Sequence, residues 1–399
     1  MKDLMINSEK AIVSILKHFI SGDKIVDVSK IIDWDKFRRL AEINSISGIV
    51  GFVFEQTDSE NIPQGVRQRF SEAFLSTITL STMRDEAMKK LEKQLDRQGI
   101  DHLVFKGLTV KNLYPIPELR TFGDIDFAIR ASERDRCHNL MMKLGFHIHD
   151  DWEPVYSYYN GYESYEIHTQ LLDSNLNDKA NYQDYFRDFW THAIQIGDHS
   201  FILEPEFHLM FLLVHIAKHL YCSGAGIRMY MDIAFFIRTY RTTIDWVHFE
   251  KEVKLLNLSG FVNSVFSAVE SWFEVESPII LSSVDETFMD EFLSFTLNGG
   301  VFGYNGKAAK LSQVRKNSYG QSVKRLDTLR KRAFPSVDTI KSRYTYLDGK
   351  PWLLPAAWVH RFFKKKGTIV EYVGESKRII KANKKDVVEL NDFYRKIGL

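Results

Sequence analysis

Apolar residues in the first hundred positions recur at intervals of three and four, as Ile12 and Ile15 do. This spacing places them on one face of an α-helix, so the pattern predicts a helical N-terminal region over residues 1–98. Its last helix is expected to begin near Leu80 and to stop at Gly99, because glycine readily adopts the backbone conformation that ends a helix.

The pattern changes after Gly99, where Ile100–Phe105 forms a contiguous apolar run that is too short for a helix. A buried strand is the better match. A second strand is predicted over Asp124–Arg130, and a helix from Ser132 to Gly145 follows it. Further strand-like stretches cover 146–149 and 164–172. Strands that alternate with short helices predict a small mixed β-sheet backed by helices, over residues 99–175.

Helical spacing returns at Glu206 and predicts a helical domain over residues 205–275, in which Asp245 is expected to be the N-cap of a helix. A polar stretch before residue 205 is expected to connect it to the sheet. Residues 276–399 are expected to be mostly helical. The predicted fold class is therefore α+β: a small mixed β-sheet core, a helical N-terminal region and a helical C-terminal domain.

The composition gives enough apolar material for two or three packed units, since 44% of the 399 residues are hydrophobic. The formal net charge is only +1, so no overall field points to nucleic acid or to an anionic membrane as a partner. The two cysteines, Cys137 and Cys222, are too few and too far apart for a disulfide framework or a thiolate zinc site. They suit a reducing compartment.

The location of the protein is expected to be cytoplasmic. The most apolar window, Leu209–Ala217, is about half the length that a helix needs to cross a bilayer, and it contains His215. The first twenty residues mix charged with apolar side chains, so they predict an amphipathic helix where a secretory signal would have an uninterrupted apolar stretch. We therefore expect a soluble protein that does not contact a membrane.

Asp124 and Asp126 are the strongest candidates for chemistry. They lie two apart in a predicted strand, so their side chains point to the same face with the carboxylates close together. The apolar neighbours Ile125 and Phe127 predict that the pair is buried, where two like charges repel each other unless a cation neutralises them. Hard oxygen ligands favour Mg²⁺ or Mn²⁺.

Other candidate residues lie close to this pair along the chain. Lys106-Gly107 stands where a buried strand meets a helix start, and glycine would let backbone amides approach phosphate oxygens closely. Lys106 and Arg120 could bind those phosphates or pair with a carboxylate and neutralise it. Glu166 supplies a third acid, which could bind metal or accept the proton of an attacking hydroxyl.

These residues resemble the DNA-polymerase-β-like nucleotidyltransferase superfamily, which has a glycine after a strand, an acid-hydrophobe-acid strand and a later acid on another strand. More narrowly, the chain is similar to the bacterial family described as uncharacterised nucleotidyltransferases (nucleotidyltransferase family 5). The matching segments are Phe105-Lys106-Gly107, Arg120, Gly123-Asp124-Ile125-Asp126 and Glu166-Ile167-His168. Two positions differ: Leu108 replaces a small residue, and Glu166 replaces the usual aspartate.

The resemblance extends into the helical part, through His215-Ile-Ala-Lys-His219, Arg228 and Met231-Asp232. Lys218, His219, Arg228 and Asp232 could line the groove opposite the acids and bind substrate, or they could pair with one another. His168 could position substrate or serve as a structural histidine.

Several patterns do not carry a function of their own. His215 and His219 stand four apart, but the glutamate of a zinc-protease motif is replaced by Ile216 and no further ligand set is evident. Ser223–Gly226 lacks the third glycine of a dinucleotide site and is expected to be a turn. The basic segments 361–366 and 377–385 are followed by acids, so a solvated amphipathic face is favoured over RNA binding.

The function expected from the sequence is metal-dependent transfer of a nucleoside monophosphate from a nucleoside triphosphate to an unknown hydroxyl-bearing acceptor, either a small molecule or a protein, with release of pyrophosphate. Asp124, Asp126 and Glu166 would be the metal ligands, and Lys106, Gly107 and Arg120 would bind the phosphates. The alternative is a catalytically inactive module of the same fold that binds a nucleotide or recruits a partner. The acceptor and the base of the nucleotide are not encoded in any pattern that can be read.

Overall fold

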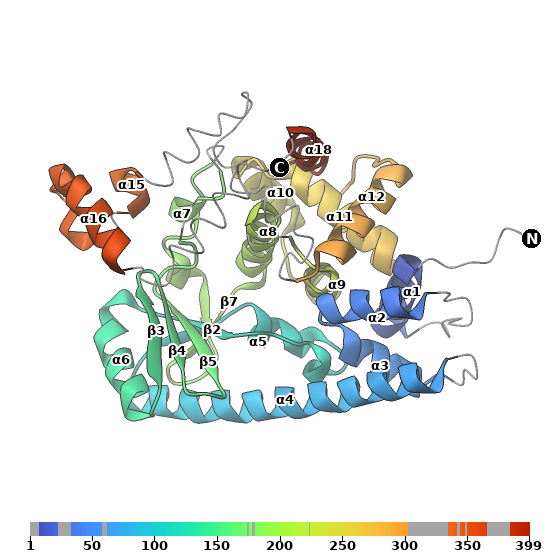
Figure 1. Ribbon diagram of the computed structural model, residues 1–399, viewed down its shortest axis with the longest axis horizontal. Coiled ribbons are helices and arrows are strands. Elements are labelled where there is room, and N and C mark those ends of the chain that lie inside the picture. The colour runs from blue at the N-terminus through green and yellow to red at the C-terminus, as the bar shows by residue number, and fades with distance from the viewer. Residues whose placement is uncertain are drawn as a thin grey trace, which may run out of the picture.

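The computed structural model describes residues 8–22, 33–57, 62–173, 175–177, 180–222, 224–301, 334–340, 344–347, 349–364 and 384–399. Within these residues the chain forms one mixed β-sheet surrounded by helices (Figure 1). The α+β prediction, with helical regions on both sides of a small sheet in the sequence, is confirmed.

The seven strands of the sheet are ordered β3-β4-β5-β2-β1-β7-β6. Their bounds are β1 His102–Val104, β2 Ile125–Ile129, β3 His147–Trp152, β4 Val155–Tyr159, β5 Ser164–His168, β6 Ala193–Gln195 and β7 Ser200–Leu203. β2 runs parallel to β5 and antiparallel to β1, and β1 runs parallel to β7. β6 and β7 follow residue 175, the predicted end of the core, so the sheet extends further along the chain than its pattern indicated.

In the described residues, four helices precede the sheet: α1 Ser8–Ser21, α2 Trp34–Ile43, α3 Ser47–Glu55 and α4 Gln64–Arg97. With 34 residues, α4 starts well before the predicted Leu80 and runs under both the N-terminal helices and the sheet (Figure 1). Gly51 lets α3 lie directly against it, because a Cβ atom there would be 2.1 Å from the Phe70 carbonyl oxygen. As predicted, α4 ends just before Gly99, whose φ is +61°.

Successive side chains along each strand point to opposite faces of the sheet, and each face packs against a different part of the core. Ile125, Phe127 and Ile129 of β2 are buried in a cluster with Leu91 of α4 and Met141 of α6 (Arg134–Lys143). The opposite face carries Leu103, Phe105 and Ala128, which belong to the larger core that includes the C-terminal helices. Short helices connect the strands: α5 Gly107–Val110, η2 Lys111–Leu113, η3 Pro117–Leu119, η4 Ala131–Glu133, α6 Arg134–Lys143, α7 Tyr182–Tyr185 and η5 Phe189–His192.

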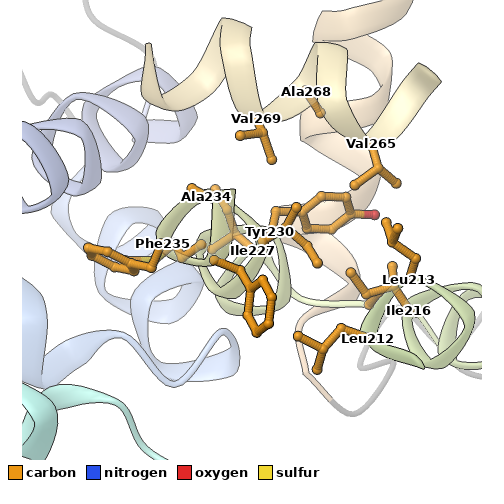
Figure 2. Packing of buried hydrophobic residues seen from close by; sticks show 14 of the residues in the cluster. Leu212, Leu213, Ile216, Ile227, Tyr230, Ala234, Phe235, Val265, Ala268 and Val269 are labelled. Atoms are coloured by element: carbon orange, nitrogen blue, oxygen red, sulfur yellow. The ribbon is translucent and has the colours of Figure 1, made fainter. Parts of the chain in front are cut away.

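The helices after the sheet are α8 Pro205–Cys222, α9 Ile227–Tyr240, α10 Trp246–Leu255, α11 Ser259–Phe273 and α12 Glu286–Gly299. Figure 2 shows Tyr230 of α9 among side chains of α8 and α11, such as Ile216 and Val265. Full burial of an aliphatic side chain of this size contributes about 1.5–3 kcal/mol, so these contacts anchor the helices. The predicted N-cap Asp245 is confirmed, since its carboxylate accepts from the backbone amides of Val247 and His248 at 3.0 Å.

The tail contains α15 Val337–Ile340, η6 Thr345–Leu347, η7 Pro351–Leu353, α16 Leu354–Lys364 and α18 Lys384–Lys396. Residues 365–366 and 377–383 of the two basic tail segments, and Ser223 of the expected turn, lie outside the described residues. Among the helices that are described, none is both long enough and apolar enough to cross a bilayer.

Candidate active site

Two acids meet where β2 and β5 run side by side. The parallel register pairs Asp126 with Glu166, so both carboxylates project from the same face of the sheet. Their neighbours Tyr165 and Ile167 project to the opposite face and are at most 1% exposed. This arrangement is the one that strand alternation predicted for Glu166.

His168 lies on the same face, two residues further along β5. Its Nε2 atom is 2.9 Å from Oδ1 of Asp126 and 3.8 Å from Oε2 of Glu166. The ring packs edge-on against Phe105, and burial lowers the pKa of His168, so a neutral imidazole is favoured. Potential ligand atoms of Asp126, Glu166 and His168 all lie within 4.8 Å of one another, which is close enough to hold one metal ion.

Asp124 occupies a different environment from the one predicted. The strand begins at Ile125, and Asp124 lies in the preceding bend with its side chain exposed. The expectation that apolar neighbours would bury both aspartates is wrong for Asp124, because the chain has not yet entered the sheet at this residue. Asp124 still borders the site, since its negative charge contributes to the raised pKa of Glu166.

The two neighbouring carboxyl groups have opposite pKa shifts. Burial, together with the negative charges of Asp126 and Asp124, raises the pKa of Glu166 to about 7. Burial alone would raise the pKa of Asp126 as well, but the Lys106 ammonium and the hydrogen bond from His168 hold it well below its usual range. At neutral pH Asp126 is therefore ionised while Glu166 can exchange a proton.

Lys106 provides the charge that Asp126 needs. Its Nζ atom is 2.6 Å from Oδ1 of Asp126, in a pair whose side chains are only 14% and 16% exposed. The backbone of Lys106 has a φ of +56°, which for a residue other than glycine requires about 1–3 kcal/mol of support from its surroundings. His208 of α8 supplies part of this support, because its Nε2 accepts from the Lys106 amide at 3.3 Å.

His208 was not singled out from the sequence. Burial lowers its pKa to about 4, which keeps Nε2 available as an acceptor at neutral pH. Its position seven residues before His215, on the same face of a helix, is the signal that could have identified it.

Gly107 is required because Arg120 lies against it. A Cβ atom on Gly107 would be 2.3 Å from the Nη1 atom of Arg120. Arg120 in turn pairs with Asp232 of α9, through Nε–Oδ1 at 3.1 Å and Nη2–Oδ2 at 2.6 Å. Tyr114 donates a further hydrogen bond to Oδ1 of Asp232 at 2.7 Å. Both predicted phosphate-binding cations, Lys106 and Arg120, are thus paired with carboxylates.

Arg228 of α9 contacts the segment that leads into β2. Its Nη1 atom donates to the carbonyl oxygen of Thr121 and, at 2.6 Å, to the Thr121 hydroxyl. Burial and the neighbouring Arg120 lower the pKa of Arg228 to about 10. Arg228 and Asp232, expected from the sequence to bind substrate or to pair, therefore hold protein groups next to the acids.

A comparison with protein families matches residues 30–274 to the family described as uncharacterised nucleotidyltransferase. The matched range includes the whole sheet, the three acids and helices α8, α9 and α11. The chain belongs to this family. No curated protein and no solved structure matches the chain. The family supports a role in nucleotidyl transfer, as the sequence motifs implied.

The family match also covers the α8 residues near the acids. Lys218 pairs with Asp173 at 2.6 Å, and the rings of His215 and His219 are 4.5 Å apart. Burial and the nearby Lys106 lower the pKa of His219, to about 4, so its imidazole is neutral. Within the described part of the chain, no group of three metal ligands includes His215 or His219.

Proposed function

We propose that the protein transfers a nucleoside monophosphate from a nucleoside triphosphate to a hydroxyl group of an acceptor, and releases pyrophosphate. The acceptor oxygen forms a bond to the α-phosphorus, and the bond from that phosphorus to the oxygen bridging to the β-phosphate breaks. The observation that carries this proposal is the paired register of Asp126 and Glu166 in a chain that belongs to a nucleotidyltransferase family.

The residues at the site fit a divalent metal. Asp126 and Glu166 offer hard carboxylate oxygens, and His168 offers an imidazole nitrogen within the same 4.8 Å cluster. The oxygens favour Mg²⁺ or Mn²⁺, and the nitrogen makes Mn²⁺ the better match of the two. When bound, such an ion supplies positive charge to the triphosphate and lowers the pKa of the acceptor hydroxyl.

The chain's own residues would bind the ion, accept the proton and contact the phosphates and the substrates. Asp126 and Glu166 would hold the ion, with exposed Asp124 joining them from the solvent side. The carboxylate oxygen of Glu166 that does not hold the ion would receive the acceptor's proton. Lys106, the Gly107 amide and the Nη1 side of Arg120 would neutralise phosphate oxygens. His168, Lys218 and His219 are proposed to contact the substrates.

The experiment measures pyrophosphate release by the full chain from each of four nucleoside triphosphates, with Mg²⁺ or Mn²⁺ and a small-molecule extract as the acceptor source. Transfer of an α-phosphate label to an acceptor is followed in parallel. Asp126→Asn should abolish both signals. Asp101→Asn is the matched control, because Asp101 pairs with Arg130 and His199 near the opposite end of β1.

Release that persists in Asp126→Asn would contradict the proposed site. Equilibrium binding of a triphosphate with no release under any of these conditions would favour the non-catalytic binding module over the enzyme.

A further inference from the structure

Lys106 is paired with the Asp126 carboxylate, which is also a proposed metal ligand. We propose that Lys106 keeps the metal from Asp126 until a triphosphate draws the ammonium group away, so that nucleotide binding promotes metal binding. This inference rests on the proposed function, because it assumes that Asp126 is a metal ligand and that the phosphates lie beside Gly107.

Lys106 and His168 both contact one carboxylate oxygen of Asp126. Oδ1 of Asp126 is 2.6 Å from Nζ of Lys106 and 2.9 Å from Nε2 of His168, so the lone pairs of this oxygen are already in use. Magnesium bound directly to a carboxylate lies at roughly 2.0–2.1 Å from the oxygen. Two cations on one oxygen would repel each other strongly in a site that is largely shielded from solvent. The ammonium and the metal therefore compete for the negative charge of the Asp126 carboxylate.

The Lys106 side chain can move away from Asp126 while its backbone stays in place. Its backbone is fixed by the turn at φ +56° and by the hydrogen bond to His208, but its four-carbon side chain can rotate. The next residue, Gly107, has no side chain that could come between a phosphate and the backbone of this turn. A short swing of the side chain takes the ammonium from Asp126 to an anion beside this turn.

The other cations near the acids differ from Lys106 in their partners. Arg120 is held by Asp232, Arg228 donates to Thr121, and Lys218 pairs with Asp173, so none of these bonds is broken when a metal binds. Lys106 alone among these four cations has a partner that is itself a proposed metal ligand. A metal at Asp126 frees Lys106 for phosphate, and phosphate frees Asp126 for metal, so each ligand should strengthen the binding of the other.

The test is a titration of the full chain with Mn²⁺ alone, followed by the electron paramagnetic resonance signal of free Mn²⁺. Lys106→Met should bind Mn²⁺ about tenfold more tightly than the wild type, the factor expected when a modest ion pair no longer has to be broken. Lys36→Met is the matched control, because Lys36 pairs with Glu9 between α1 and α2, outside the sheet. It should bind Mn²⁺ as the wild type does.

A second arm measures binding of a nonhydrolysable nucleoside triphosphate in the presence of a chelator, where Lys106→Met should bind severalfold more weakly than the wild type. Opposite effects on the two ligands distinguish competition from general damage to the site. Adding Asp126→Asn to Lys106→Met should remove the gained Mn²⁺ affinity. If Lys106→Met does not fold, Lys106→Gln takes its place, and Lys106→Arg should keep wild-type Mn²⁺ affinity in either case.

Equal Mn²⁺ affinity in Lys106→Met and the wild type would overturn the inference, whether that affinity is high or undetectable. Tighter Mn²⁺ binding with no pyrophosphate release from any triphosphate would leave the competition at Asp126 intact and reject the proposed transfer reaction. Transfer activity in the wild type, with Mn²⁺ affinity unchanged in Lys106→Met, would support the transfer reaction and reject the competition at Asp126. The two proposals therefore fail separately.

Discussion

Arg120 and Asp232 form a buried ion pair with two contacts, which joins the segment before β2 to helix α9. They are 112 residues apart in the sequence, and the side chains are 8% and 5% exposed. The pair, together with Arg228 and Thr121, fixes the chain where it enters the strand that carries Asp126. The helical region after the sheet is thus part of the structure that positions the acids.

Asp232→Ala should destabilise the protein by about 3–5 kcal/mol, because it leaves Arg120 buried without its counter-charge, next to a second buried arginine. The measurement is the free energy of unfolding in denaturant. Asp173→Ala is the comparison, since Asp173 pairs with Lys218 at the surface, and its loss should change stability by less than about 1 kcal/mol. Equal effects of the two substitutions would show that the buried pair has no special structural role.

Gly107→Ala should destabilise the protein by about 1–3 kcal/mol, because the added methyl group would overlap the Arg120 guanidinium, which Asp232 holds in place. Gly123→Ala provides a control on the other side of Arg120. A Cβ atom at Gly123 meets nothing within 4 Å, so the change in unfolding free energy should stay within about 0.5 kcal/mol. Chemical denaturation of both variants checks the contrast.

Glu166→Gln should stabilise the protein at pH 8 in the presence of a chelator, and should have little effect at pH 4.5. The folded protein holds the Glu166 proton up to about pH 7, whereas the unfolded chain releases it near the ordinary glutamate value. The penalty for ionising Glu166 therefore develops as the pH rises through this window, and the amide removes it.

Because a third of the Glu166 side chain is exposed, the gain is expected to be only about 1 kcal/mol. Unfolding midpoints of the wild type and Glu166→Gln at the two pH values measure it. A gain of equal size at pH 4.5 would mean that ionisation of Glu166 is not its cause.

Much of the sheet could be predicted from local patterns. Three central strands are predicted by the apolar run before Lys106 and by the alternation of apolar and polar residues around Asp126 and Glu166. This alternation has a period of two because successive side chains in a strand point to opposite faces of the sheet. The short strands β6 and β7 lack such a pattern, since Gln195 and Ile194 are exposed at the sheet's edge. These two strands are defined only by their pairing, in which β7 pairs with β1 and β6 pairs with β7.

The site was predicted less completely, because charge pairing depends on contacts between distant segments. From sequence, Asp124 and Asp126 form a repelling pair that needs a metal. In the structure Asp124 is exposed, and the charge of Asp126 is balanced by Lys106, twenty residues earlier. Likewise, no local pattern indicates that Arg120 faces Asp232 or that His208 supports the Lys106 turn.

Asp124→Asn and Asp126→Asn should separate catalysis from stability. Both should lower pyrophosphate release at least about a hundredfold, since each removes a charge proposed to act on the triphosphate site. In the absence of metal, only Asp126→Asn should change the free energy of unfolding substantially, because it breaks the pairs with Lys106 and His168. Asp124 is exposed, so Asp124→Asn should change the free energy of unfolding by no more than about 0.5 kcal/mol. Denaturation and pyrophosphate assays on the same preparations provide both readouts. Wild-type release in Asp124→Asn would leave Asp126, Glu166 and His168 as the full ligand set.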